Sequence, residues 1–134
     1  MRVMVIGCGR VGSGLANRLD SEGHQVTVLD RDQQAFRRLS EIFKGERILG
    51  NGLIEEFIRP TLDEKVDYLF VVTEKDNVNL MIAQKAKRRF QIGRVIARVH
   101  DASLASLYRQ ELGLETVCPT DLVIRSLLDL TRQS

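Results

Sequence analysis

Residues 3 to 12 read Val3-Met4-Val5-Ile6-Gly7-Cys8-Gly9-Arg10-Val11-Gly12, and they carry the strongest indication of the fold. It leads from an apolar, strand-like run into the glycine spacing G-x-G-x-x-G, which a helical pattern follows. A second apolar run, residues 25 to 29, ends at Asp30, and an acid about 20 residues after the glycines completes the pattern. Strand, glycine turn, helix, strand and acid in this order are the fingerprint of a dinucleotide-binding βαβ unit.

Each glycine of the turn has its own expected role. Gly7 would permit the tight turn off the strand, Gly9 would let a pyrophosphate come close to the backbone, and Gly12 would let the helix pack on the sheet. Phosphates would then lie at the helix N-terminus, where free N–H groups and the helix dipole favour anions. The alternative is that the glycines only shape a turn.

Asp30 is the predicted ribose-binding acid. Its carboxylate would accept hydrogen bonds from the two ribose hydroxyls and would repel a 2′-phosphate, so the sequence favours NAD over NADP. Arg31 beside it leaves NADP open, because an arginine accommodates a 2′-phosphate. In the alternative without a ligand, Asp30 would only cap a helix.

The composition is typical of a globular protein of one domain. The 134 residues, 43% hydrophobic and 28% charged, suffice for a core but leave no room for a second, substrate-binding domain. The net charge of +2 predicts no attachment to nucleic acid or lipid. No apolar run approaches the ~20 residues of a membrane span, and no cleavable signal is evident, so we expect a cytoplasmic protein without direct membrane insertion.

Strand-like and helix-like segments alternate, which predicts an α/β fold, a Rossmann-like, doubly wound parallel sheet of six strands. Strands are expected at residues 2–6, 25–29, 46–49, 67–72, 94–98 and 115–118. Helices are expected at residues 10–22, 76–89 and 102–111, and from about Asp32 through Phe43. The crossover at residues 53–58 is expected to be a helical turn or two, cut by Pro60.

The last segment, residues 119 to 133, begins with a proline and carries a broad apolar stripe. The stripe consists of Leu122, Val123, Leu127, Leu128 and Leu130. It follows the sixth strand and has little left to cover. Two roles remain open, closure of the domain's own sheet or dimerisation by packing on another copy, because an exposed stripe would form a large apolar patch.

The glycine turn and several motifs beyond it share one family pattern. The turn is residues 5–12, and the other motifs are residues 23–30, 50–52, 72–80, 96–99 and 112–115, which include Val72-Thr73-Glu74-Lys75-Asp76-Asn77-Val78-Asn79-Leu80. With these motifs the chain resembles the TrkA-N (RCK, KTN) domains that regulate bacterial potassium channels and transporters. The match runs at consistent spacing to about Asp121, and the block V-T-x-x-D-x-x-N-L distinguishes this family from ordinary dehydrogenases.

The resemblance implies a ligand of the ATP, ADP or NAD(H) class and a dimer whose two nucleotide sites communicate. It implies that Asn51 and Gly52 form the adenine-side turn, that Thr73 lies over the phosphates and that Arg98 is a cationic pocket residue. Arg10 matches a position that in some members reaches the terminal phosphate across the dimer. The predicted nucleotide-binding residues are Gly7, Gly9, Arg10, Val11, Gly12, Asp30, Arg31, Asn51, Gly52, Thr73 and Arg98.

Three features depart from the family pattern. The family turn most often reads Gly-Asp where this chain has Gly50-Asn51, a change that keeps an acceptor and adds donors, so binding should survive it. Several members carry an acid after the proline that follows strand six, associated with a divalent ion; here Thr120 follows Pro119, and we predict no metal site. The smaller C-terminal domain (the RCK C-lobe) of many members is absent, so we expect either a minimal single-domain member or a truncated chain.

Other polar residues give weaker signals. We interpret His24 as a turn residue, whereas His100 follows strand five near the expected cleft. Asp76 and Asn79 share a helix face, either as solvated groups or as residues at the ligand or subunit edge. Cys8 is interpreted as a small turn residue rather than a redox sensor.

The leading hypothesis is a nonenzymatic regulatory module. It would dimerise, or assemble further into a ring, and report adenine-nucleotide or NAD(H) state to a membrane potassium transporter or channel subunit, at the inner face of the membrane. The alternative is the cofactor-binding portion of an NAD-dependent oxidoreductase. The glycine motif and Asp30 fit that alternative equally well, but catalysis would need a substrate pocket and a proton donor, and the chain offers no second domain to supply them.

Overall fold

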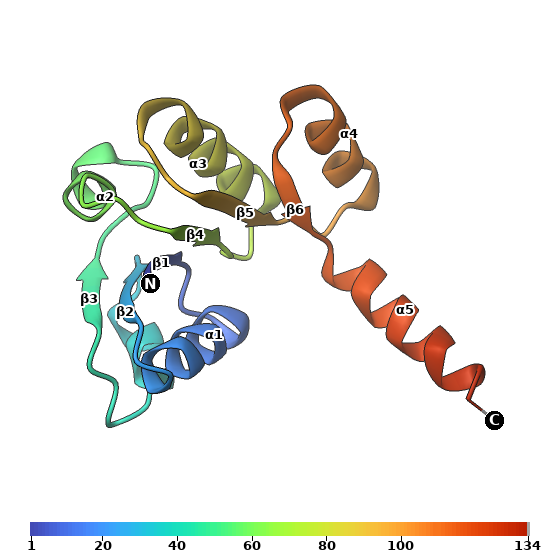
Figure 1. The fold of residues 1–134 in the computed structure, drawn as a ribbon, viewed down its shortest axis with the longest axis horizontal. Coiled ribbons are helices and arrows are strands. Elements are labelled where there is room, and N and C mark those ends of the chain that lie inside the picture. Colours follow the sequence, from blue (N-terminus) through green and yellow to red (C-terminus); the bar gives the residue numbers. More distant parts are fainter. Residues whose placement is uncertain (134) are drawn as a thin grey trace.

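The computed structural model describes residues 1–133, and Figure 1 shows one parallel sheet flanked by helices. The strand order is β3-β2-β1-β4-β5-β6. The strands are β1 (Arg2–Ile6), β2 (Gln25–Asp30), β3 (Glu46–Leu49), β4 (Tyr68–Val71), β5 (Arg94–Arg98) and β6 (Glu115–Val117). The helices are α1 (Arg10–Ser21), the 3₁₀ helix η1 (Gln33–Arg38), α2 (Glu55–Leu62), α3 (Asp76–Arg89), α4 (Ala102–Leu112) and α5 (Pro119–Thr131). The predicted Rossmann-like sheet of six strands is confirmed, and each strand end lies within one residue of its predicted place.

The central strand β1 pairs with β2 on one side and with β4 on the other, and both of its faces are buried. Side chains alternate along a strand, so Val3 and Val5 enter the core under α1 and η1. Met4 and Ile6 enter the core under α2 and α3 on the opposite face. A strand that is apolar at every buried position is typical of a parallel sheet covered on both sides, and each such side chain contributes about 1.5–3 kcal/mol by its burial.

The helix predicted from about Asp32 through Phe43 is wrong, because only the short η1 forms there. The apolar spacing that suggested a longer helix is used by turns instead. Leu39 and Phe43 are buried against α1 and β2, whereas Ile42 is 77% exposed. A helix would have placed Ile42 beside Leu39 on the inner face.

Side chains of α1 explain why η1 stops early. Asn17 Oδ1 accepts a hydrogen bond from Ser40 N at 2.8 Å, and Asp20 Oδ2 accepts one from Lys44 N at 3.0 Å. These bonds satisfy backbone N–H groups that a continuing helix would have paired internally. The segment therefore follows α1 as a series of turns.

The third crossover also differs from the prediction, because α2 continues through Pro60 instead of being cut there. Proline removes one intrahelical donor, but Pro60 is exposed, so water can reach the acceptor that loses its partner. Ile58 and Leu62, on either side of it, are buried in the core and share a face of the helix. Glu55 at the helix start forms an ion pair with Arg89 of α3 at 2.9 Å. The contacts at both ends of α2 stabilise the helix by more than the hydrogen bond lost at Pro60 costs.

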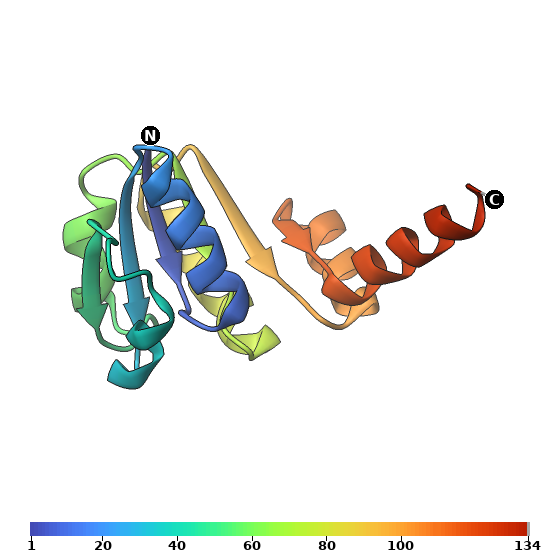
Figure 2. The same ribbon diagram turned by 90° about the horizontal axis from the view of Figure 1, so that it is seen from below.

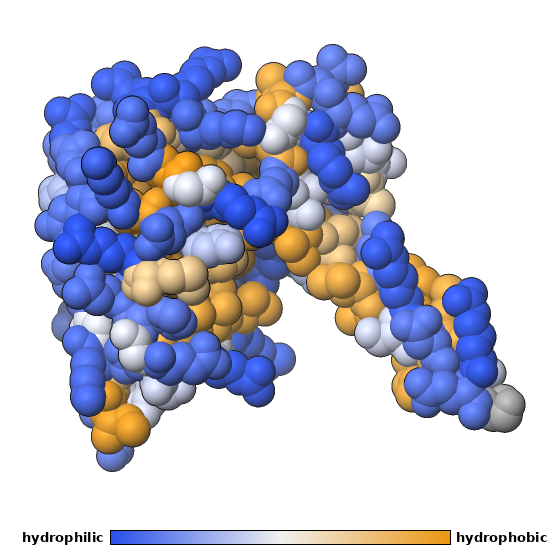
Figure 3. Space-filling model, viewed as in Figure 1, coloured by the Kyte–Doolittle hydropathy of each residue, from blue (hydrophilic) through white to orange (hydrophobic). Residues whose placement is uncertain are grey.

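The C-terminal helix α5 extends away from the rest of the molecule (Figures 1 and 2), and none of its residues is buried. Figure 3 shows hydrophobic surface along it. Its apolar residues, 46% to 64% exposed, are Leu122, Val123, Ile124, Leu127, Leu128 and Leu130. Closure of the domain's own sheet by this helix is therefore wrong, and packing on another copy stays a prediction. Within residues 1–133, no helix has the length and apolar character needed to cross a membrane.

Candidate functional site

Two adjoining cavities lie at the carboxyl ends of the strands, where β1 has β2 on one side and β4 on the other. Loops that leave neighbouring strands in opposite directions open a crevice at such a switch point. The smaller cavity, about 380 Å³, is lined by the ends of β1 and β2, and the larger, about 1030 Å³, by the start of α1 and the ends of β4 and β5. The residues common to both cavities are Gly9, Arg38, Glu74, Lys75 and Val78.

The cleft brings together every predicted site residue except Gly12. The smaller cavity is lined by Gly7, Gly9, Asp30, Arg31, Asn51, Gly52 and Thr73. The larger cavity is lined by Gly9, Arg10, Val11 and Arg98. Gly9 stands at the junction of the two, whereas Gly12 is buried in the first turn of α1.

The glycines of the loop differ in what surrounds them. Gly7 has a φ of +107°, and a Cβ there would stand 2.8 Å from Thr73 N. A Cβ on Gly12 would stand 1.7 Å from Gly7 O, so both positions require glycine for the fold itself. Gly9 has an extended backbone with a φ of −79°, and a Cβ there would meet no atom within 4 Å. The open space over Gly9 fits a ligand that approaches the backbone.

The helix α1 begins directly after Gly9, with its N-terminus at the cleft. Its first intrahelical hydrogen bond runs from Ser13 N to Gly9 O at 2.9 Å, so the N–H groups of Arg10, Val11 and Gly12 have no acceptor inside the helix. In the part of the chain that the structure describes, no side chain caps this end, and its first turn has no acid. Free N–H groups and the positive end of the helix dipole together favour an anion here.

Asp30 is hydrogen-bonded to the glycine loop. Its Oδ2 accepts from Cys8 N and its Oδ1 from Asp32 N, each at 2.8 Å. A carboxylate oxygen has a second lone pair, so both can still accept from hydroxyl groups. Burial, with the charge of Asp30 as a smaller cause, raises the pKa of the fully buried Cys8 thiol to about 11. Cys8 is thus a neutral thiol near pH 7, which fits its interpretation as a turn residue.

The turn after β3 forms a wall of the smaller cavity. Asn51 Oδ1 accepts from Leu53 N at 3.0 Å and so closes the turn with its own side chain. The Nδ2 group of Asn51 makes no hydrogen bond to any residue from 1 to 133 and remains available as a donor. A Cβ on Gly52 would meet Ile82 Cδ1 at 2.9 Å and Ile6 Cγ2 at 3.0 Å, so the backbone here lies against the core.

A buried asparagine ties the ends of β4 and β5 together. Asn79 is 0% exposed, and its Oδ1 accepts from Thr73 N at 3.0 Å and from the Thr73 hydroxyl. Its Nδ2 donates to Thr73 O and to Arg98 O, each at 2.9 Å. Asn79 is therefore not a solvated group of the helix face. It fixes Thr73 at the edge of the cleft.

Arg98 extends from the end of β5 beneath the loop that follows β4. Its Nη2 donates to Val72 O and to Thr73 O, each at 2.8 Å. Its Nε is buried and has no hydrogen-bond partner among the described residues. A buried donor without a partner is uncommon in folded proteins. The guanidinium thus supports the loop opposite Gly9 and keeps one donor unused beside the larger cavity.

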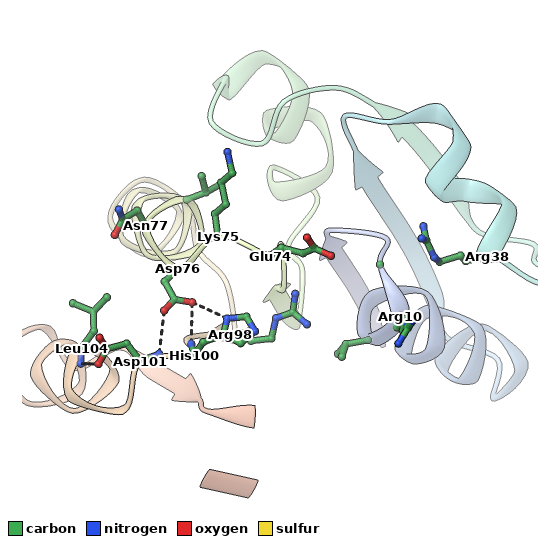
Figure 4. Close-up of a pocket in the computed structure, with 13 residues that line it drawn as sticks. Arg10, Arg38, Glu74, Lys75, Asp76, Asn77, Arg98, His100, Asp101 and Leu104 are labelled. Atoms are coloured by element: carbon green, nitrogen blue, oxygen red, sulfur yellow. Dashed lines mark hydrogen bonds and ion pairs between the residues drawn. The ribbon is translucent and has the colours of Figure 1, made fainter. Parts of the chain in front are cut away.

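Asp76 fastens the start of α3 to the turn between β5 and α4 (Figure 4). Its Oδ1 accepts from His100 N at 2.9 Å and lies 3.0 Å from His100 Nδ1, while its Oδ2 accepts from Asp101 N at 3.1 Å. Burial opposes ionisation of Asp76, but these hydrogen bonds outweigh it and hold the pKa of the carboxyl below its ordinary value. His100 therefore lies at the cleft, with Asp76 as the partner of its ring.

Neither the glycine motif nor the family pattern points to Arg38 or Lys75, although both line the two cavities. Arg38 ends η1, the segment for which the wrong helix was predicted, so no spacing placed it near the glycine loop. Lys75 occupies a variable position of the V-T-x-x-D block. Their positive charge was the only available signal.

The cleft is suited to binding a phosphorylated ligand that also carries hydroxyl groups. The larger cavity offers the backbone N–H groups at the start of α1 and four cationic side chains, Arg10, Arg38, Lys75 and Arg98, beside the carboxylates of Glu74, Asp76 and Asp101. The smaller cavity offers the carboxylate of Asp30. Among the residues that the structure describes, no group of three or more His, Cys, Asp or Glu side chains could hold a metal ion.

Known sequences that are similar to this chain belong to one family. The profile of the TrkA-N domain matches residues 3–120. The Trk system potassium uptake protein TrkA of Streptomyces coelicolor is 39% identical over 132 residues, which are 96% of this chain and 59% of that protein. The chain therefore spans about three fifths of the length of this curated relative.

Several solved structures have the same fold. The TrkA-N domain of the inner membrane protein ybaL from Escherichia coli aligns with a TM-score of 0.83 at 24% identity, over 96% of this chain and 95% of that one. The Shewanella denitrificans Kef CTD in AMP-bound form aligns at 0.75 and 21% identity, over 97% and 82%. The GsuK channel bound to NAD aligns at 0.70 and 18% identity, over 88% and 21%. At these identities the likeness is one of fold.

Proposed function

The chain belongs to the TrkA-N domain family, and we propose that it is a single nucleotide-binding regulatory domain that acts on a membrane potassium transporter or channel subunit. The Streptomyces coelicolor relative, named as a potassium uptake protein, supports this assignment. The domain would work at the inner face of the membrane through its partner. It would do so by binding rather than by catalysis.

The observation that carries the nucleotide proposal is the open space over Gly9, at the junction of the two cavities and beside the free N–H groups of α1. A phosphate chain that approaches the backbone needs this combination. The proposed ligand is ATP, ADP or NAD(H). The AMP and NAD in the two ligand-bound structures support this class, because both molecules contain an adenosine joined to phosphate.

The proposed roles follow the two cavities. Asp30 would accept from the ribose hydroxyls, and the turn at Asn51 and Gly52 would lie beside the adenine, so the smaller cavity would take the nucleoside. The N–H groups at the start of α1 would bind the phosphates. Arg10 and Arg98 in the larger cavity would bind the part of the ligand that lies beyond its first two phosphates.

The proposed mechanism of regulation is differential affinity. A ligand shifts a protein between two arrangements only as far as it binds one better than the other, typically by 1–3 kcal/mol of coupling. The arrangements proposed here are two geometries of a homodimer, or of a ring built from dimers, joined through α5. Because Arg10 is exposed at the mouth of the larger cavity, it is our candidate for a residue that also contacts a nucleotide in the second subunit.

Titration calorimetry with ATP, ADP, NAD and NADH tests the proposal, with two alanine variants that differ only in position. Gly9→Ala would place a methyl group where the phosphates approach, and we expect it to weaken binding at least about tenfold. Gly14→Ala is the matched control, since Gly14, like Gly9, has no atom within 4 Å of its Cβ position, but it lies inside α1 and lines neither cavity. It should bind normally.

Three outcomes would contradict the proposal. One is failure of the unmodified protein to bind all four nucleotides. Another is equal affinity of the Gly9→Ala and Gly14→Ala variants, because the open space over Gly9 would then serve no ligand. Oxidation of NADH with a carbonyl substrate by the purified protein would instead favour the oxidoreductase alternative.

A further inference from the structure

Arg38 lines both cavities and has no partner for its side chain. It ends η1, and its guanidinium makes no hydrogen bond or ion pair within residues 1–133. Figure 4 shows Arg38 on one side of the cleft and Lys75 on the other. A planar guanidinium with five donors and no partner is suited to bind a phosphate group.

The position of Arg38 favours the phosphates over the ribose as the part of the ligand that it would bind. Arg31, the other arginine that lines the smaller cavity, lies there with Asp30 and does not line the larger cavity. Arg38 shares with Gly9 the junction of the two cavities, where the backbone is open and α1 begins. In the proposed binding mode, a cation beside Asp30 would face the ribose of the nucleotide, whereas a cation at the junction of the two cavities would face its phosphates.

The backbone of Arg38 is held against α1. Asn17 Nδ2 donates to Arg38 O at 3.2 Å, and Asn17 Oδ1 accepts from Ser40 N at 2.8 Å. Leu39, between these two residues, is buried in the core under α1. The attachment point of the Arg38 side chain is thus fixed relative to α1, which begins at the glycine loop, and the residue itself is exposed.

The charge of Arg38 reaches the glycine loop. Burial and the charge of Asp30 raise the pKa of Cys8, whose position lies between Gly7 and Gly9, and the charges of Arg38 and Arg47 oppose that rise. Arg47 has the same effect but lies in a separate surface hollow, so it is the place of Arg38 in both cavities that would bring its charge beside a ligand bound over Gly9.

We infer that Arg38 is a phosphate-binding residue, which contacts the diphosphate of the nucleotide from the η1 side of the cleft, and that Asn17 is its positioning residue. The inference rests on the proposed function and deepens it. It assigns to η1 a direct part in ligand binding, beside the parts that the glycine loop and the start of α1 would take.

Calorimetry of two neighbouring arginine variants tests this assignment, with ADP and NAD as phosphate ligands and adenosine as the ligand without phosphate. Arg38→Ala should raise the Kd for ADP and NAD about tenfold and leave that for adenosine unchanged. Arg37→Ala is the matched control. Arg37 is exposed on the same helix but lines a separate surface hollow with Phe36 and Arg47, so its removal should change none of the three affinities.

The positioning role of Asn17 can be tested by measuring ADP affinity in a double variant. Asn17→Ala should weaken ADP binding less than Arg38→Ala does, and in a chain that already carries Arg38→Ala it should cause no further loss of ADP affinity. A merely structural role would lower ADP affinity by the same factor in both backgrounds. Arg38→Gln, which keeps a long polar side chain without the charge, provides a second variant should Arg38→Ala fail to fold by circular dichroism.

The outcomes separate this inference from the proposed function. If the unmodified protein binds ADP or NAD but the Arg38→Ala and Arg37→Ala variants behave alike, the inference is overturned and the nucleotide site stands. Equal losses of adenosine and ADP in Arg38→Ala would also overturn it, since the residue would then hold the nucleoside. Failure of the unmodified protein to bind any nucleotide would overturn both.

Discussion

Among single residues, the glycine loop contains some glycines that the fold requires and one that only a bound ligand would require. A methyl group on Gly12 would stand 1.7 Å from Gly7 O, so substitution there must displace α1 whether or not a ligand binds. A methyl group on Gly9 would disturb nothing within 4 Å. Loss of binding without loss of stability is therefore the mark of a ligand contact in this loop, and Gly9 is the position that can show it.

Arg10 should distinguish ATP from ADP. Its side chain is exposed, lines the larger cavity and makes no hydrogen bond within residues 1–133, so it is free to bind the outermost phosphate. We expect Arg10→Ala to weaken ATP binding about tenfold more than ADP binding, because only ATP presents a third phosphate. Parallel calorimetric titrations measure the ratio.

Arg18→Ala is the control for that experiment, since Arg18 is exposed in the last turn of the same helix and lines neither cavity. It should leave the ATP to ADP ratio unchanged. Equal losses of ATP and ADP affinity in Arg10→Ala would show that the residue does not distinguish the two.

At the scale of elements, prediction from sequence worked where the signal was local. The glycine spacing, the apolar runs and the acid that closes β2 all lie within about thirty residues, and they were enough to place β1, α1, β2 and Asp30. The end of η1 was missed because it depends on side chains from another helix, Asn17 and Asp20. Arg38 was missed with it, because its place in the cleft follows from where η1 stops.

The role of Asn79 was missed for a related reason. Its four hydrogen bonds go to Thr73 and Arg98, and the bond to Arg98 exists only because β4 and β5 are neighbours in the sheet. Spacing along α3 shows which face a residue occupies, but not which polar groups of other strands that face meets. Buried hydrogen-bond networks of this kind follow from topology.

Asn79 should contribute strongly to the stability of the fold. Asn79→Ala should lower the free energy of unfolding by about 2–4 kcal/mol, because it leaves buried backbone groups of Thr73 and Arg98 without partners. Asn77→Ala, at an exposed position of the same helix, should change it by no more than about 0.5 kcal/mol. Urea denaturation followed by circular dichroism measures both. Similar stabilities of the two variants would mean that the ends of β4 and β5 do not depend on this asparagine.

In the whole molecule, α5 stands out because none of its residues is buried, so its apolar face lacks tertiary packing. An isolated helix of this length is marginal in water, since most helical stability comes from packing of an apolar face. Its six exposed apolar side chains would each contribute about 1.5–3 kcal/mol if fully buried. A second copy of the chain is the proposed cover, which would make the stability of α5 a property of the dimer.

Sedimentation equilibrium tests that expectation. The unmodified protein should be a dimer, and Leu127→Asp, which puts a charge on the apolar face at a position 59% exposed in the single chain, should shift it toward monomer. Arg125→Gln lowers the net charge by the same amount on the polar side of the helix and should leave the dimer intact. A monomeric unmodified protein would contradict the role given to α5.

The place of β1 between β2 and β4 also sets the order in which the molecule can be completed during its synthesis. Its partner on one edge, residues 25 to 29, leaves the ribosome soon after it, whereas its partner on the other edge, residues 68 to 71, comes some forty residues later. Until then the inner edge of the nascent sheet exposes unpaired backbone groups, a form that favours pairing with other chains. The crevice between β1 and β4 has only one wall in that interval, so a nascent chain has its glycine loop well before the opposite wall of the cleft can form.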